Sequence, residues 1–322
     1  MRRRRLLEGL GGVAITAFSW RATRGADLPT VRVGLAEGDD ATPTLYGVKA
    51  GLFRKYGLNV EITPMPSGAA GLAALAGGAV DVAGTSLLPL FSAYSRGLPV
   101  QLVAPLAAYA PESLYAVILV KKDAPYASGR DLKGKTIGSP ALKDLNWLAS
   151  MAWIDQNGGD SSTVTSLEIP PSVIPNALEH GRIDAATVTT PRYVQAVNAG
   201  GVRILGRSYE AIAKHFVFAA FAARTEYANK NPEVIARFGR AIRDASEYAN
   251  THHADTLALY AAFAKIDPKE IANAPRAISP PYLQPREIQP LIDAAVRYKV
   301  LPRTIDPASI VSSAALRAGS EA

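Results

Sequence analysis

The sequence has 322 residues, a formal net charge of +7 and no cysteine; this length is sufficient for two domains, and the lack of cysteine excludes disulfides, thiolate metal sites, cysteine nucleophiles and a lipid-modified leader. Most of the positive charge lies in residues 1–26, whose six arginines and one glutamate, once removed, leave a formal charge of +2. Because no basic run with interleaved aromatic residues remains, no nucleic-acid partner is expected.

Residues 1–26 are expected to form an export signal peptide. Four consecutive arginines precede an apolar run that suits a signal-peptide core and is too short to cross a bilayer. The pair Arg3-Arg4 resembles a twin-arginine signal, but no hydroxyl residue precedes it and Glu8 stands where a basic residue is usual. Sec and Tat export therefore both stay open, with cleavage expected within residues 22–27.

Short strands alternate with helices after the leader. Strands are expected at 31–35, 58–63, 80–83 and 100–105, and helices at 43–52 and after the N-cap residue Ser67. This alternation favours a parallel sheet, in which ligands bind outside the carboxyl ends of the strands. The loops 36–42, 66–69 and 84–87 should therefore share one edge of the sheet.

Part of this series is nearly repeated later in the chain. LAALAGGAVDVAGTS at 72–86 and PNALEHGRIDAATVTT at 175–190 align at a spacing of 103 residues, and KTIG at 135–138 follows VRVG at 31–34 by 104. The matched motif positions are Leu75, Gly78, Val80, Asp81 and Ala83 with Leu178, Gly181, Ile183, Asp184 and Ala186. Each copy is expected to run from a helix end through a glycine turn into a short apolar strand and then a hydroxyl-rich loop, which contains Thr85 and Ser86 in the first copy and Thr187, Thr189 and Thr190 in the second. The chain is therefore expected to form two similar α/β lobes.

Two long apolar runs, 114–121 and 215–223, are expected to cross between these lobes. The second lobe should then span 113–216, and the first lobe should be discontinuous. Its two parts are 27–112 and 217–322.

The second lobe is expected to have further strands at 135–138 and 166–169, and the chain after 223 is expected to be helical. These late helices should pack back on the first lobe. In the helix that follows Gln284, Pro290 removes an interior hydrogen bond, which favours two short helices.

Three stretches resemble the periplasmic substrate-binding proteins of ABC importers, in the branch that includes sulfonate, taurine, nitrate and thiamine-precursor binders. They are PSGAAGLAALAGGAVDVAGTSLLPLFSAYSRGLPVQLVA at 66–104, VKKDAPYASGRDLKGKTIGS at 120–139 and PSVIPNALEHGRIDAATVTTPRY at 171–193. The resemblance, which extends over residues 31–310, implies the type II periplasmic binding fold, with two α/β lobes of mainly parallel sheets joined by two crossing strands. It also implies a periplasmic monomer that closes on one small molecule and delivers it to an ABC permease. No cofactor, metal or enzymatic activity is expected.

The expected ligand contacts are residues that follow strands or begin helices beside the cleft in this fold. In the first lobe they are Glu37, Asp39, Asp40, Thr42, Ser67, Gly68, Thr85 and Ser86, and in the second lobe Ser139, Asn146, Ser172, Thr189, Thr190 and Arg192. Thr85 and Thr189 are favoured because equivalent loops should face one cleft. Asp81 and Asp184 are expected to be scaffold residues.

The acidic loop EGDD at 37–40 bears on the charge of the ligand. The expected ligand is a small organic anion of the sulfonate or carboxylate type, which suits helix N-termini and hydroxyl groups. Three carboxylates beside the same cleft oppose such an anion. Either they point to solvent, or the ligand carries an amine or several hydrogen-bond donors.

Several motif matches are set aside. GRDLKGKT at 129–136 fits phosphate-loop spacing, but such a loop opens a helix, whereas the TIG that follows is typical of a strand. GLGGVA at 9–14 loosely fits a dinucleotide fingerprint but lies in the leader. The four histidines are scattered, at His180, His215, His252 and His253, and no G-x-S-x-G elbow occurs.

Two other functions stay open. A thiamine-pyrimidine-precursor binder, or a related pyrimidine-synthase-like enzyme, would share the fold, although that enzyme depends on a cysteine-rich motif that this chain lacks. The effector domain of a transcription regulator would need an N-terminal helix-turn-helix, and the leader occupies that place.

Overall fold

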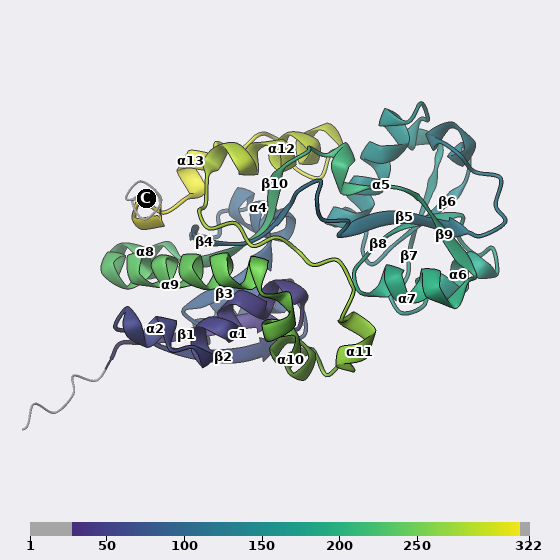
Figure 1. Cartoon of the computed structure of the whole chain (residues 1–322). Coiled ribbons are helices and arrows are strands. Elements are labelled where there is room, and N and C mark those ends of the chain that lie inside the picture. Colours follow the sequence, from purple (N-terminus) through teal and green to yellow (C-terminus); the bar gives the residue numbers. More distant parts are fainter. Residues whose placement is uncertain (1–27, 316–322) are drawn as a thin grey trace, which may run out of the picture.

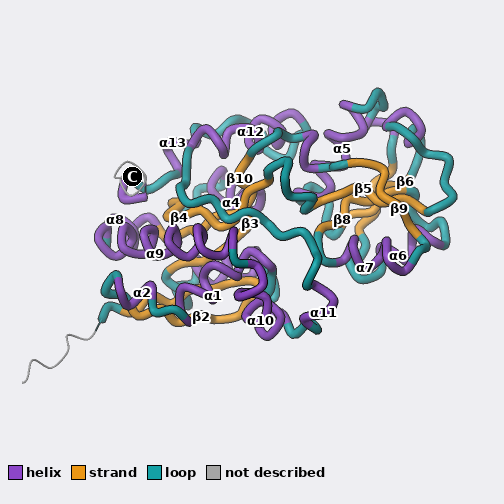
Figure 2. The backbone as a smooth tube through the Cα atoms, viewed as in Figure 1, coloured by secondary structure: helices purple, strands orange, loops and turns teal. Residues whose placement is uncertain are grey.

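A computed structural model describes residues 28–315 of the chain, so the expected export signal and its cleavage region lie outside the described residues. Figure 1 shows two α/β lobes side by side, each built around its own sheet. The late helices α9 and α12 lie with the first lobe, as expected from the sequence (Figures 1 and 2). No helix of the described chain is long and apolar enough to cross a membrane.

The first-lobe sheet has the order β2-β1-β3-β10-β4. Its strands are β1 (Thr30–Ala36), β2 (Asn59–Met65), β3 (Val82–Ser86), β4 (Val100–Tyr109) and β10 (Phe216–Arg224). β1 pairs in parallel with β2 and β3, whereas β10 runs antiparallel to β3 and β4. The strand that returns from the second lobe is therefore inserted into the first sheet.

The second-lobe sheet has the order β7-β6-β8-β5-β9. Its strands are β5 (Ala116–Lys121), β6 (Thr136–Ser139), β7 (Thr165–Glu168), β8 (Ala185–Thr189) and β9 (Val202–Gly206). β5, which enters from the first lobe, runs antiparallel to β8 and β9. Each sheet is thus three parallel strands extended by an antiparallel crossing strand and one outer strand.

The helices flank these sheets. In the first lobe they are α1 (Thr42–Lys49), α2 (Leu52–Lys55), α3 (Gly68–Ala76), α4 (Leu87–Ser95), α8 (Thr225–Lys230), α9 (Pro232–Thr251), α10 (His253–Ala264), α11 (Pro268–Ile271), α12 (Pro285–Arg297) and α13 (Pro307–Ile310). In the second lobe they are α5 (Leu145–Gln156), α6 (Ile174–Glu179) and α7 (Arg192–Ala199). Short 3-10 turns occur at Asp39–Ala41, Gly129–Leu132, Ser161–Thr163 and Tyr209–Ala211.

The sheet register reproduces the spacing of the sequence repeat. Val33 pairs with Val82 in the first lobe, and Ile137 pairs with Ala185 in the second, at offsets of 104 and 103 residues. The two turn glycines of the motif, Gly78 and Gly181, both have left-handed backbone angles, with φ of +78° and +68°. Glycine adopts that conformation without the steric penalty of a Cβ, so the same turn is built twice.

Several elements differ from the sequence expectation. Thr85, Ser86 and Ser139 end strands rather than standing in the loops after them. The helix expected at 43–52 is divided into α1 and α2, and the left-handed Gly51 lies between them. The division follows from this residue, whose φ of +72° is incompatible with a continuous right-handed helix.

The expected break at Pro290 is wrong, because α12 runs through it as one helix. Pro290 lies in the second turn, where its ring displaces one backbone hydrogen bond. The buried face of α12 continues past it through Ile288, Leu291, Ile292 and Ala295. Burying three such large side chains stabilises by roughly 1.5–3 kcal/mol each, which outweighs a proline penalty of about 3 kcal/mol.

Candidate ligand-binding cleft

A cavity of about 320 Å³ lies between the two lobes. The first lobe contributes the ends of β1 and β3, the starts of α3 and α4, and parts of β4 and β10; the second contributes the start of α5, the end of β8 and two tyrosines. The lining residues are Ala36, Asp40, Gly68, Ala69, Gly84, Thr85, Ser86, Pro89, Leu106, Tyr115, Asp144, Leu145, Asn146, Thr189, Tyr209, Phe218 and Ala219. The carboxyl ends of the parallel strands meet here, which is the usual ligand position in such sheets.

Six of the expected contact residues line this cavity: Asp40, Gly68, Thr85, Ser86, Asn146 and Thr189. Ser86 and Thr189 are the last residues of β3 and β8, 103 positions apart, so they occupy equivalent sites in the two lobes. Their hydroxyl groups therefore come to one cavity from both sides.

The rest of the acidic loop lies outside the cavity lining. Glu37 pairs with Lys265 at 3.4 Å on the surface. Asp39 is buried, accepts a hydrogen bond from Arg276 Nε at 2.7 Å and another from the Ala277 N–H at 2.8 Å. The Thr42 hydroxyl accepts from Arg276 Nη2 at 2.7 Å. Arg276 thus holds the acidic loop in place through Asp39 and Thr42, a contact that the sequence did not indicate.

The other expected contacts are engaged in local structure. Ser67 caps α3 by accepting the Ala70 N–H at 3.2 Å. Ser139 is fully buried and donates to Asp144 Oδ1 at 2.8 Å. The Thr190 N–H donates to the Tyr115 carbonyl, and Ser172 and Arg192 are exposed and do not line the cavity.

Three helices begin at the cavity. The first residues of α3, α4 and α5, or their caps Ser86 and Asp144, belong to its lining, and these helices have nine, nine and twelve residues. The first-turn N–H groups of a helix lack intrahelical partners and carry a partial positive charge. At α5 the Asn146 and Trp147 N–H groups are already bonded to the Asp144 carboxylate, so the starts of α3 and α4 are the ones that attract an anionic or hydrogen-bond-accepting group.

Asp40 lies on another part of the wall. No side chain of the described residues donates a hydrogen bond to its carboxylate, and no arginine, lysine or histidine is among the residues that line the cavity. Burial, and next the charge of Asp39, raise the pKa of Asp40 to about 7. The carboxylate thus has backbone hydrogen bonds from its own N–H and that of Ala41, but no positively charged side chain among the residues that line the cavity.

Aromatic residues that the sequence interpretation missed form another part of the wall. Tyr115 and Phe218 stack with ring centroids 5.4 Å apart, and Tyr209 packs edge-on against Phe218 at 5.6 Å. The Tyr209 hydroxyl donates to Asn146 Oδ1 at 2.9 Å. A signal was present, since Tyr115 and Phe218 both lie in the apolar runs expected to cross between the lobes, next to any interlobe cleft.

Asp81 and Asp184 hold their sheets together outside the cavity. Asp81 accepts hydrogen bonds from the backbone N–H of Arg32 at 3.0 Å and from its guanidinium at 2.7 and 3.0 Å. Asp184 accepts from the Thr136 N–H at 2.8 Å and the Tyr126 hydroxyl at 2.6 Å. In each lobe the motif aspartate thus joins the strand that follows it to the first strand.

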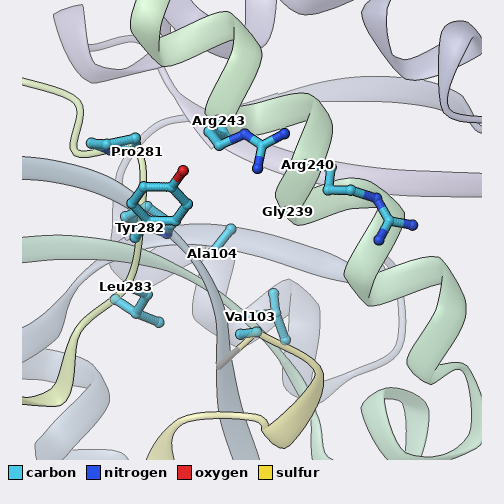
Figure 3. Close-up of a pocket in the computed structure, with 10 residues that line it drawn as sticks. Val103, Ala104, Gly239, Arg240, Arg243, Pro281, Tyr282 and Leu283 are labelled. Atoms are coloured by element: carbon cyan, nitrogen blue, oxygen red, sulfur yellow. The ribbon is translucent and has the colours of Figure 1, made fainter. Parts of the chain in front are cut away.

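A second depression lies wholly in the first lobe, between β4, α9 and the segment 281–283 (Figure 3). Its volume of about 20 Å³ holds roughly one water molecule, and Val103, Ala104 and Leu283 contribute to its wall. It is too small for an organic ligand. Among the described residues, no group of three or more histidine, aspartate or glutamate side chains is placed to hold a metal ion.

The fold and the cleft define a class: two-lobed α/β proteins that bind a ligand between their lobes. Within it, the family model described as NMT1/THI5 like matches residues 39–255, and the chain belongs to this family. The taurine-binding periplasmic protein of Escherichia coli (strain K12) is 26% identical over 239 residues, which are 74% of this chain and 70% of that protein.

Solved structures share the architecture. The periplasmic aliphatic sulphonate binding protein SsuA from Escherichia coli superposes with a TM-score of 0.73 at 20% identity, covering 89% of this chain and 98% of its own. The periplasmic nitrate-binding protein NrtA from Synechocystis PCC 6803 gives 0.71 at 16% identity, covering 92% and 89%. These likenesses confirm the expected two-lobed fold, and all three relatives are binding proteins.

Proposed function

We propose that this protein is an extracytoplasmic solute-binding protein that captures a small organic anion, of the sulfonate or carboxylate type, between its lobes and delivers it to an ABC permease. The observation that carries the proposal is the interlobe cavity, in which Ser86 and Thr189 stand at equivalent strand ends and three helices begin. The named relatives, which bind taurine, aliphatic sulphonates and nitrate, support the choice of an anion.

Ligand capture is proposed to work by closure of one lobe on the other. The chain crosses between the sheets twice, between β4 and β5 and between β9 and β10, which supports the proposed lobes at 27–112 with 217–322 and at 113–216. A ligand that touches both walls favours the closed state only as far as it binds that state better. The permease would then recognise the closed, loaded form.

The same proposal covers location, partners and chemistry. We propose export through residues 1–26, a periplasmic location and a monomeric state; the periplasmic relatives support the location. No catalytic role is proposed, since the groups that line the cavity suit binding: hydroxyls, backbone N–H groups, one amide, aromatic rings and carboxylates.

The test is thermal unfolding of the purified protein with a panel of alkyl and aryl sulfonates, taurine, nitrate, aromatic carboxylates and pyrimidines. A ligand at 100 times its dissociation constant stabilises the folded state by about 2.7 kcal/mol. We expect sulfonates or carboxylates to raise the melting temperature. If only simple cationic amines do so, the anion proposal is wrong.

The hydroxyl contacts are tested by replacing Thr85 and Thr189 together with valine. Each lost hydrogen bond weakens binding by about 1 kcal/mol, so the affinity should fall roughly 10- to 30-fold in calorimetry. The ligand-free melting temperature should change little, because valine also suits a strand. Unchanged affinity would remove both residues from the site.

The stacked pair of Tyr115 and Phe218 favours a second candidate, a flat heterocycle such as a pyrimidine precursor. Pyrimidines are in the panel for this reason. Stabilisation by pyrimidines alone would select that candidate over the anion.

A further inference from the structure

Two carboxylates at equivalent positions of the cleft have different surroundings. Asp40 and Asp144 are 104 residues apart, the offset between the first strands of the two lobes, and both line the cavity. Asp144 caps α5 by accepting the Trp147 N–H at 2.7 Å and also accepts the Ser139 hydroxyl at 2.8 Å. Asp40 precedes α1 without any such side-chain donor. The Asp144 carboxylate stabilises local structure, whereas the Asp40 carboxylate is available to a ligand in the cavity.

The groups around Asp40 do not neutralise it. Asp39 beside it is already paired with Arg276, and its charge raises the pKa of Asp40 further. Asp40 also interacts electrostatically with the hydroxyls of Tyr115 and Tyr260 on other elements; burial raises the pKa of both tyrosines, so both stay neutral. A desolvated carboxylate that has backbone N–H partners but no opposite charge is costly to the folded state, and a bound cation would lower that cost.

The aromatic wall suits the same cation. Tyr115 lines the cavity and interacts electrostatically with Asp40, and its ring stacks on Phe218. Ammonium groups bind favourably over aromatic faces within about 6 Å, especially when water is excluded. Asp40 and Tyr115 come from different lobes, so a cation held by both would also join the lobes.

We infer that the ligand is zwitterionic: an ammonium group faces Asp40 and the ring of Tyr115, while its sulfonate or carboxylate faces the helix starts at Gly68 and Ser86. This inference rests on the proposed function and adds the charge that the acidic loop left open. Asp40 is then the residue that distinguishes amino-substituted anions from plain ones.

The experiment compares ligand pairs in which a hydroxyl replaces the amine. Taurine is paired with isethionate, and 4-(aminomethyl)benzenesulfonate with 4-(hydroxymethyl)benzenesulfonate, so that a small and a larger ligand are both tested in the cavity. Calorimetry on the purified protein should show about 10- to 100-fold tighter binding of the amine in at least one pair, as expected for a hydrogen bond between charged groups.

The Asp40→Asn variant should reduce this preference to about threefold or less. The control is Glu37→Gln, which removes a carboxylate of the same loop that pairs with surface Lys265 and does not line the cavity. Glu37→Gln should keep the full preference. Loss of the preference in both variants would mean that general loop charge, not Asp40, selects the amine, and would overturn the assignment.

A second readout is the pH dependence. An ammonium favours the ionised form of Asp40, so amine affinity should rise by up to about tenfold from pH 5.5 to pH 8, and Asp40→Asn should abolish the rise. If hydroxyl analogues bind as tightly as amines and more tightly at low pH, Asp40 acts as a neutral donor to an anion, and the zwitterion inference is wrong while the proposed function stands. If no compound of either kind binds, the proposed function fails as well.

Discussion

The two lobes share one topology and one sequence motif, yet they are stabilised differently. The first lobe has an aromatic core, in which Phe53, Phe221 and Phe238 lie within 5.6 Å of one another in successive pairs. Between Phe91 and Phe216 the sequence has no phenylalanine, and the second lobe packs mainly aliphatic residues on the two faces of its sheet. The repeat therefore specifies the strand plan, whereas core composition is free to diverge.

The same contrast holds at the cleft. Positions that build the sheets, such as Asp81 and Asp184, have similar backbone bonds in both lobes. Equivalent positions that line the cavity have different roles in the two lobes. Asp144 caps a helix, whereas Asp40 lines the cavity without a side-chain donor. Equivalent residues thus keep one role where the scaffold requires it and differ where they line the cavity.

The largest expected effect concerns the core of the first lobe. Phe238 is fully buried between two other phenylalanines, so Phe238→Ala should destabilise by about 3–5 kcal/mol in urea unfolding. Leu178→Ala in the second lobe, also fully buried, should cost about 2–4 kcal/mol. An equal or reversed order would show that the aromatic core does not make the first lobe the more sensitive one.

The next largest effect is expected at the two motif aspartates, Asp81 and Asp184, whose substitution should cost different amounts of stability. Asp81→Asn should cost about 1–3 kcal/mol, because it removes the partner of the Arg32 guanidinium, whereas Asp184→Asn keeps an acceptor for the Thr136 N–H and should cost about 1 kcal/mol. Although burial opposes it, the hydrogen bonds and charge of Arg32 lower the pKa of Asp81.

The lowered pKa of Asp81 determines how the stability of the protein depends on pH. The stabilisation by Asp81 is present above the unfolded pKa of about 3.9 and is lost as pH falls through the lower folded pKa. Urea unfolding at pH 7 and at pH 3 should therefore show the wild type losing part of its advantage over Asp81→Asn at the lower pH. A constant difference would contradict the ion pair.

Substitution of Asp40 and of Asp144 should change the stability of the folded protein in opposite directions. Asp144→Ala removes a helix cap and should destabilise by about 1 kcal/mol. The folded pKa of Asp40, about 7, lies above the unfolded value of about 3.9, so the folded protein binds more protons in that range and loses stability as pH rises.

Without ligand, Asp40→Asn should therefore be more stable than wild type by about 1–2 kcal/mol at pH 8 and by less at pH 5, measured by urea unfolding. A variant that is less stable than wild type at pH 8 would mean that the Asp40 carboxylate already has a partner in the ligand-free protein.

The sequence predicted the scaffold better than the cleft, for physical reasons. Strand patterning and the motif repeat are local signals, and they located the sheets and the end positions Ser86 and Thr189. Arg276 is 237 residues from Asp39 in the chain, so no local pattern could show that it holds the acidic loop. The hydroxyls of Ser67 and Ser139 suit both capping and ligand binding, and only the folded geometry shows that Ser67 already accepts the Ala70 N–H and that Ser139 already donates to Asp144.

The smallest expected effect lies at a hydrogen bond between the two lobes. Tyr298, at the end of the first-lobe helix α12, donates to Asp155 Oδ2 on α5 of the second lobe at 2.8 Å. Tyr298→Phe keeps the ring and removes this bond, so ligand-free stability should fall by less than about 1 kcal/mol. In the proposed closure the two joined parts move relative to each other, so the loss of this bond should also weaken ligand binding about two- to fivefold in calorimetry. Tyr248→Phe is the matched control, because Tyr248 donates to Asp255 at the same 2.8 Å within the first lobe and should change stability alone. Equal affinity in the two variants would show that the Tyr298 contact is present in both the open and closed states, and closure would then depend on the ligand and on the cleft residues themselves.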